Sequence, residues 1–291
     1  MCHRVLLAAA AVLAVSPAAL HAQAAAPAST TVLSIYREVV KPGKNFAHDA
    51  HESAWTKAMI AAKSPSRFLA MTPMSGPNEN WYVSSFENWA ALEKANMAGM
   101  ATPALAAIQK SFGAKEEEFL SDGRLMTLRE HPELGYGGMS DIANMRYLTV
   151  TRVSVRPGHN MEWEAMRKEI AKAHEVAHLA DKYSLWEVTS GAPAGTYYIM
   201  APQKSLAELD GGAAMHAGAA YMAALGGDDG QQKRAAIAAS AVVSSQIDRF
   251  EFAPSQSNPP EAWVTANPKF WKPAAPAAAA PAAKKPPAKK P

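Results

Sequence analysis

The chain has 291 residues, of which 19% are charged and 48% hydrophobic, and its only cysteine is Cys2. A single thiol at this position excludes disulfides, cysteine metal ligands and a thiol nucleophile from the rest of the chain. The formal net charge is +3, but residues 254–291 carry six lysines and one glutamate. After removal of Arg4 with the predicted signal described below, the part before this tail is close to −3. No folded unit has an excess of basic residues, so nucleic acid is not an expected partner.

The first 24 residues have the layout of a cleaved secretory signal. His3 and Arg4 precede an apolar run from Val5 to Val15, and Ala22-Gln23-Ala24 follows as an A-x-A cleavage site. The apolar run is shorter than the ~20 residues that a membrane-spanning helix needs, so no transmembrane segment is expected. We therefore expect a periplasmic or secreted protein, with residues 25–31 disordered after cleavage.

The next hundred residues follow one order of elements, β-α-β-β-α-β, which is the ferredoxin-like arrangement. Alternating and helical patterns predict a strand at 32–40, a helix at 44–62, strands at 67–72 and 81–86, a helical region at 87–119 and a strand at 124–129. Gly99 and Pro103 are expected to interrupt that helical region. These elements define a first repeat at residues 32–130.

A second repeat, residues 146–253, is predicted after a linker at 131–145. Its elements are a strand at 146–155, a helix at 161–179, strands at 183–189 and 196–201, a helical region at 205–244 and a strand at 246–252. Residues 254–291 are rich in Pro, Ala and Lys and are expected to be disordered. Such a tail is a solubilising spacer or contacts an anionic envelope surface.

The two predicted repeats share a strand that ends in Pro-Gly. The segment Leu33-Ser-Ile-Tyr-Arg-Glu-Val-Val-Lys-Pro-Gly-Lys-Asn45 corresponds to Leu148-Thr-Val-Thr-Arg-Val-Ser-Val-Arg-Pro-Gly-His-Asn160. Six residues of the first segment recur 115 positions later, and a period of this length is typical of a duplicated domain rather than a solenoid.

This repeated pattern resembles the dimeric α+β barrel superfamily, which includes antibiotic-biosynthesis-monooxygenase-like and NIPSNAP-like proteins. The resemblance implies an α+β fold in which two tandem ferredoxin-like repeats form an intrachain barrel. It also implies a small pocket between a sheet and its helices, and either cofactor-independent oxidation or haem handling. No residues here match those families' catalytic positions, so enzymatic activity stays open, as does the choice between monomer and homodimer.

Comparison of the two repeats points to a ligand site on the first helix. The apolar stripe of the second repeat's helix contains Trp163 and Met166, and the positions 115 earlier are His48 and His51. Imidazoles on a core-facing stripe need hydrogen-bond partners, water or a ligand; the alternative is a rotated helix that exposes them. The predicted ligand-binding residues are His48, His51, Trp55, Trp81 and Tyr82.

A second candidate is the H-E-x-x-H sequence from His174 to His178. On a helix it places two imidazoles one turn apart, able to share a zinc ion, with Glu175 as general base. The alternatives are an adventitious or structural metal site and an ordinary helix flank. A zinc enzyme also needs a third ligand. Asp181 and Glu187 are the nearest carboxylates downstream, and neither has the spacing of a known metalloprotease class.

Three functions follow from these features. The first is binding or modification of a small, partly apolar molecule in a pocket of the first repeat. The second is a zinc-dependent hydrolase that uses His174, Glu175 and His178. The third is a non-catalytic cell-envelope scaffold. No cofactor is expected for the first function, with zinc or haem as alternatives.

Overall fold

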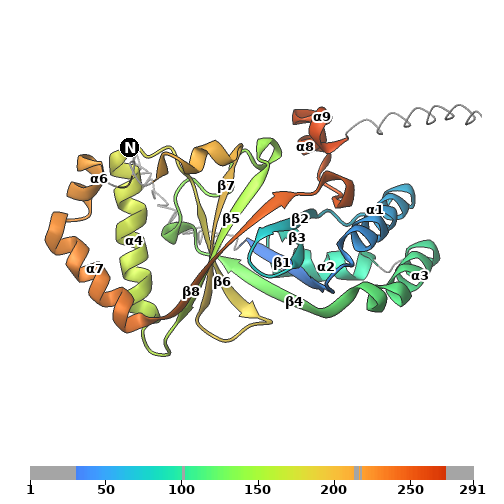
Figure 1. Ribbon diagram of the computed structural model, residues 1–291, viewed down its shortest axis with the longest axis horizontal. Coiled ribbons are helices and arrows are strands. Elements are labelled where there is room, and N and C mark those ends of the chain that lie inside the picture. The colour runs from blue at the N-terminus through green and yellow to red at the C-terminus, as the bar shows by residue number, and fades with distance from the viewer. Residues whose placement is uncertain (1–30, 100–101, 213–215, 217, 273–291) are drawn as a thin grey trace, which may run out of the picture.

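The computed structural model describes residues 31–99, 102–212, 216 and 218–272. The predicted signal at 1–24, residues 25–30 and tail residues 273–291 lie outside this part of the chain. Eight strands form a closed antiparallel barrel in the order β1-β3-β2-β8-β5-β7-β6-β4, with β4 pairing again with β1 (Figure 1). The predicted α+β class and barrel are confirmed.

The strands are β1 Val32–Val40, β2 Leu69–Ser75, β3 Glu79–Phe86, β4 Leu120–Glu130, β5 Tyr147–Val155, β6 Ser184–Ser190, β7 Thr196–Gln203 and β8 Val242–Phe252. The α-helices are α1 Asn45–Ala61, α2 Trp89–Gly99, α3 Pro103–Phe119, α4 Asn160–Ala177, α6 Ala219–Ala224, α7 Gly227–Ala241, α8 Glu261–Ala266 and α9 Pro268–Trp271. Short 3₁₀ turns are η1 Pro132–Leu134, η2 Ile142–Asn144, η3 Leu206–Leu209 and η4 Pro254–Gln256.

Each half of the chain supplies four adjacent strands of the barrel. The first half, residues 32–130, contributes the neighbours β4-β1-β3-β2, and the second half, residues 146–253, contributes β8-β5-β7-β6. The halves join where β2 pairs with β8 and β4 pairs with β6. Because both seams carry backbone hydrogen bonds, neither sheet has an unpaired edge.

Alternation along the strands separates the barrel interior from its outer faces. Leu33 and Ile35 of β1 belong to the interior core, whereas Ser34 and Tyr36 point outward to the helices. Trp81 is fully buried in the interior, 5.7 Å from the ring of Tyr198 and 4.7 Å from that of Phe250, measured between centroids. Large side chains from all eight strands thus fill most of the barrel.

Helices cover the outer faces of the barrel on two sides. In Figure 1, α1, α2 and α3 lie over the strands of the first half, and α4, α6 and α7 lie on the opposite side. The layer between sheet and helix in the second half is filled by Val153, Trp163, Met166 and Tyr197. Among the described residues, no helix is both long and apolar enough to cross a membrane.

The sequence offset of 115 residues does not hold throughout the second half. Glu38 lies opposite Asn80 in the β1–β3 pair, whereas Val153, 115 positions after Glu38, lies opposite Tyr197. The offset in β7 is therefore 117, because the connection from β5 to β7 is two residues longer. Asn80, and not Tyr82, is therefore the residue of the first half at the position equivalent to Tyr197.

The predicted start of the disordered tail at residue 254 is wrong for residues 254–272. This segment forms η4, α8 and α9, and Trp271 is buried with its indole nitrogen donating a hydrogen bond to the carbonyl oxygen of Ala143 at 2.9 Å. The ring of Trp271 also packs on those of Trp263 and Phe252. The prediction of disorder rested on the Pro, Ala and Lys content and did not take account of these aromatic residues, which anchor the segment to the barrel.

Candidate functional site

The candidate site lies between the outer face of β1 and β3 and the helices α1 and α3. Pro42 and Gly43 form the turn between β1 and α1, and Gly43 has a φ of 79°, a conformation that glycine adopts without strain. The turn folds α1 back over the strand that precedes it. As a result His48 of α1 faces Glu38 of β1, and the distance from His48 Nε2 to Glu38 Oε2 is 2.7 Å.

Polar neighbours hold the imidazole of His48 on both sides. His48 is fully buried, and the carboxylate oxygen Asp49 Oδ1 lies 3.7 Å from its other ring nitrogen, Nδ1. Burial by itself lowers the pKa of His48, but hydrogen bonding to Asp49 and Glu38 and the negative charge of Glu38 raise it to about 9. The ring is therefore an imidazolium at neutral pH and forms a buried ion pair with Glu38.

Glu52 follows His48 by one helical turn and faces the same pair. Its carboxyl group is buried, and burial together with the negative charge of Glu38 raises the pKa of Glu52 to about 8. The charge of His48 opposes this rise but does not cancel it. Glu52 therefore carries a proton at neutral pH in a site where a second carboxylate is paired with an imidazolium.

A pocket of about 260 Å³ adjoins these carboxyl groups. Aromatic rings and three glutamates form most of its wall, and Ser34, Ser84 and Gln109 complete it. The aromatic residues are Tyr36, Trp55, Phe68 and Tyr82, and the acidic residues are Glu38, Glu52 and Glu116. Such a wall suits a small, flat molecule that carries a hydrogen-bond donor.

The phenol groups at the pocket stay protonated at neutral pH. Burial and the charges of Glu38 and other acidic residues raise the pKa of Tyr36 to about 12, and burial raises that of Tyr82 well above its usual range. Tyr82 donates a hydrogen bond to Gln256 Oε1 at 3.2 Å. Glu52, with a pKa of about 8, is therefore a group on the pocket wall that changes its protonation near neutral pH, where proton transfer is most effective. Burial and the charge of Glu38 also raise the pKa of Glu116.

The predicted ligand residues are only partly brought together. Trp55 and Tyr82 line the pocket, and His48 supports its acidic wall through Glu38. His51 instead packs against Phe112 and Phe119 of α3, with ring centroids 5.1 and 5.2 Å away. Trp81 points to the other face of β3, into the barrel interior, because neighbouring residues of a strand face opposite sides.

The H-E-x-x-H residues are not gathered into one site. Helix α4 ends at Ala177, and His178 has a left-handed conformation with φ of 49° and is exposed. Glu175 is also exposed and binds Lys172 Nζ at 2.7 Å. His174 is buried and faces Asp181 and His216 instead.

Sequence comparison missed the acidic residues of the pocket. Glu38, Glu52 and Glu116 come from β1, α1 and α3 and meet only when the helices dock on the sheet. One usable signal was present, because Glu52 follows His48 by four residues and so shares its helix face. The buried face of α1 is formed by His48, Glu52, Thr56 and Met59.

Another hollow, of about 400 Å³, opens at one end of the barrel. Its wall is mainly apolar and includes Leu33, Met71, Trp186 and Met200, with Trp263 of α8 beside them. Arg67 and Glu130 are its charged residues. It offers burial to an apolar molecule, and burial raises the pKa of the Glu130 carboxyl group at its wall.

Comparison with known proteins places the chain among barrels of this kind at the level of fold. No family model and no curated protein matches the sequence. The chain is similar to a solved structure of a protein provisionally assigned as a monooxygenase from Fusobacterium nucleatum, with 10% identity, a TM-score of 0.50 and coverage of 77% of this chain and 93% of that one.

Two further solved structures show weaker similarity. A protein provisionally assigned as a monooxygenase from Lactobacillus acidophilus has 10% identity, a TM-score of 0.48 and coverage of 77% and 94%. Chlorite dismutase from Candidatus Nitrospira defluvii, in complex with imidazole, has 9% identity, a TM-score of 0.43 and coverage of 81% and 94%. At these identities the likeness concerns the fold alone.

The expectation that no cofactor is bound has no support in these comparisons. The sheet–helix layers of the two halves do not fit haem, which the sequence resemblance had implied as an alternative. The pocket of the first half is small, at about 260 Å³, and its imidazole is already paired with Glu38. The equivalent layer of the second half is filled by Trp163, Met166 and Tyr197. No reaction step is therefore assigned to haem.

Proposed function

We propose that the protein binds a small, flat, partly apolar molecule carrying a hydroxyl or amino group in the pocket of the first half. Aromatic contacts with Trp55, Phe68 and Tyr82 hold the ring system, and the carboxyl groups hold the polar group. Glu52 exchanges a proton with that group. The observation that supports this most directly is a buried carboxyl group with a pKa of about 8 on the wall of an aromatic pocket.

The Glu38–His48 pair changes the pKa of Glu52 and does not act on the ligand itself. Two carboxyl groups in different environments titrate at different pH values, so that one stays ionised while the other can give up or accept a proton. Here Glu38 is held by His48 Nε2 at 2.7 Å, and its charge helps to keep the proton on Glu52. Protonated Glu52 donates a hydrogen bond to the ligand oxygen or nitrogen, and ionised Glu52 accepts the proton from it.

Two of the proteins with a similar fold are provisionally assigned as monooxygenases. Removal of a proton from a phenol would be compatible with such chemistry. The residues here support the proton transfer, and identities of 10% give no ground for adding an oxygen-dependent step.

The proposal is tested by calorimetric titration with 1-naphthol and 1-naphthylamine, with naphthalene as the control that lacks the polar group. The full chain should bind both polar probes more tightly than naphthalene. Trp55→Ala should weaken binding of all three probes, whereas Glu52→Leu, which has no hydrogen-bonding group, should remove the preference for the polar ones. Equal affinity of the wild-type protein for naphthalene and 1-naphthol would contradict the assignment of Glu52.

We also propose that the protein is exported and that its two halves are copies of one ferredoxin-like unit. Export is supported by the signal-like residues 1–24, and fractionation of cells that express the full chain tests it. Duplication is supported by the six identical residues at an offset of 115 and by the shared order of neighbouring strands.

A further inference from the structure

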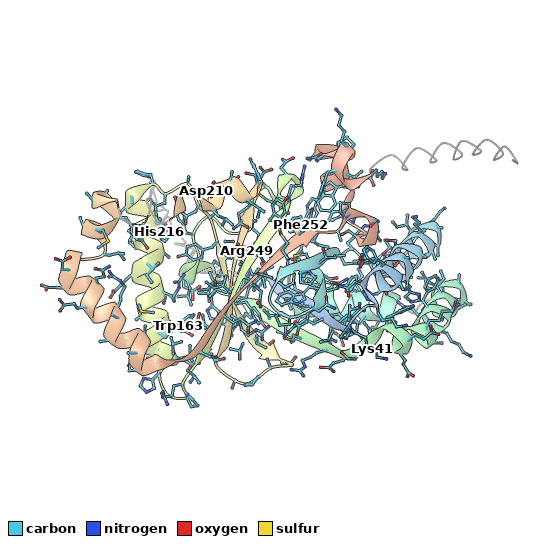
Figure 2. The ribbon with its side chains drawn as sticks, in the orientation of Figure 1. Lys41, Trp163, Asp210, His216, Arg249 and Phe252 are labelled. Carbon is cyan, nitrogen blue, oxygen red and sulfur yellow. The ribbon has the colours of Figure 1, made fainter. Side chains whose placement is uncertain are left out.

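Two imidazoles and a carboxylate meet at the far end of α4, on the opposite side of the barrel from the pocket. His174 lies in the last turn of α4, Asp181 follows the helix, and His216 comes from the segment before α6. Asp181 Oδ2 lies 3.6 Å from His174 Nε2 and 3.0 Å from His216 Nε2. Figure 2 shows His216 near one end of α4 and Trp163 near the other.

These distances match those between ligands of one metal ion. Zinc binds histidine nitrogen and carboxylate oxygen at ~2.0–2.2 Å in tetrahedral sites, which places neighbouring ligand atoms about 3.4 Å apart. The two distances from Asp181 Oδ2 bracket this value, and all three ligand atoms lie within 4.8 Å of one another. The two distances to Asp181 therefore differ from the values in a zinc site by only a few tenths of an ångström.

Neighbouring residues orient the imidazole of His174 for metal binding. Its Nδ1–H donates a hydrogen bond to the carbonyl oxygen of Ile170 at 2.8 Å, which leaves the lone pair on Nε2 directed at Asp181. The rings of Tyr136, Tyr183 and Tyr221 surround the imidazole at 5.0–5.4 Å. This arrangement fixes both the tautomer and the orientation of the ring.

One carboxylate oxygen of Asp181 lacks a hydrogen-bond partner in the described part of the chain. This atom, Oδ1, is buried. Arg167 of α4 lies over the ring of Tyr183, and no ion pair between Arg167 and Asp181 is found in the described part of the chain. Buried oxygens of carboxylates usually have a partner, and a metal ion is one that would satisfy this group.

We propose that His174, Asp181 and His216 bind a divalent metal ion, with zinc preferred, and leave its fourth position open. Three nitrogen and oxygen ligands suit zinc, and an open position is typical of sites that bind a water molecule or substrate. Asp181 and His216 line a hollow of about 640 Å³ that also contains Lys182, Lys204 and Glu208. A small carboxylate could reach the ion from this hollow, with Lys182 beside it.

The other cluster with suitable spacing, formed by Glu38, His48 and Glu52, is a poorer metal site. Its imidazole is an imidazolium at neutral pH and its Nε2 is already bound to Glu38. A metal ligand must give up its proton, so an ion would have to displace this buried pair.

The test is calorimetric titration of the metal-free full chain, purified without a histidine tag, with Zn²⁺. One ion per chain should bind. Loss of a partner of a metal ligand costs ~10–100-fold in affinity, so His216→Gln and Asp181→Asn, which remove or weaken a ligand directly, should each cost at least about 100-fold. The side chain of His216 is 43% exposed, so its replacement should leave the fold intact, which circular dichroism checks.

Two matched variants show where the ion binds. His178→Gln changes the exposed histidine of the H-E-x-x-H sequence, and Glu52→Gln changes the other cluster; both should bind zinc like the wild type. The proposal is overturned if the wild type binds no stoichiometric zinc. It is also overturned if His216→Gln binds normally while His178→Gln or Glu52→Gln loses the ion.

Discussion

The side chains of His48 and Glu38 meet between α1 and the barrel, with 2.7 Å between Nε2 and Oε2 and at most 3% of either side chain exposed. The strand residue comes only ten positions before the helix residue, and the Pro42-Gly43 turn between them makes the contact. The candidate site depends on this buried pair, because the charges of Glu38 and His48 shift the pKa of Glu52.

Glu38→Gln should destabilise the protein and lower the pKa of His48. Removal of one partner of a buried ion pair costs about 3–5 kcal/mol, and the remaining imidazole loses the charge that favours its protonated form. Urea unfolding measures the stability, and an NMR titration of the His48 ring measures the pKa. Glu175→Gln is the control, since its pair with Lys172 is exposed and should change stability by less than about 1 kcal/mol. Similar losses for the two variants would rule out a special role for the buried pair.

The free energy of unfolding should fall as pH rises through the range where Glu52 titrates. The pKa of Glu52 is raised from 4.5 to about 8 in the folded protein, so between these values the folded state holds a proton that the unfolded state releases. Stability from this group is therefore greatest at low pH and is lost towards pH 8. The size of the effect is on the order of a few kcal/mol.

Glu52→Gln should remove this part of the pH dependence. From pH 4.5 to 8 the wild type should lose stability that the variant does not lose, so the free energy of unfolding of the variant should rise relative to that of the wild type. Above pH 8 this difference should stay constant. His48, whose pKa is raised to about 9 in the folded protein, makes a further loss of stability between pH 6.5 and 9 in both proteins. A parallel pH dependence for the two proteins would show that Glu52 is ionised when folded.

Trp81→Phe and Tyr82→Phe should separate the barrel interior from the pocket. Trp81 packs on Tyr198 and Phe250 inside the barrel, so its replacement should reduce stability by about 1–3 kcal/mol and leave the affinity for 1-naphthol unchanged. Tyr82 lines the pocket, and loss of its hydroxyl, which binds Gln256, should weaken 1-naphthol binding by up to about tenfold. The reverse pattern in calorimetry and urea unfolding would place the ligand in the barrel.

Trp271→Ala should destabilise the protein although this residue lies in a Pro-rich region. The substitution removes a buried indole and its hydrogen bond to Ala143, which should cost about 3–5 kcal/mol in urea unfolding. Trp89→Ala makes the same change at a tryptophan that is 45% exposed and should cost much less. An unchanged unfolding midpoint for Trp271→Ala would mean that the C-terminal segment does not stabilise the barrel.

Local patterns in the sequence were enough to predict the order of the secondary-structure elements, and the family resemblance that this order carries predicted the barrel. Alternation in β1 and β5, the Pro-Gly turns and the helical stripes are properties of neighbouring residues, and two sheets with apolar faces bury them best against each other. The same patterns placed His48 correctly against the sheet, since Trp163 of α4 is buried on its own sheet-facing side. They did not reveal that Trp271 anchors residues 254–272.

Tertiary structure alone decided which titratable groups meet. Glu38 and Glu52 influence each other only because α1 lies on β1, and burial there changes the pKa of Glu52, a property that no spacing along the chain encodes. His174 and His216 are separated by 42 positions, and their rings lie 5.3 Å apart because α6, which follows His216 in the chain, packs on α4. The nearer residue His178 is directed away, because the helix ends before it.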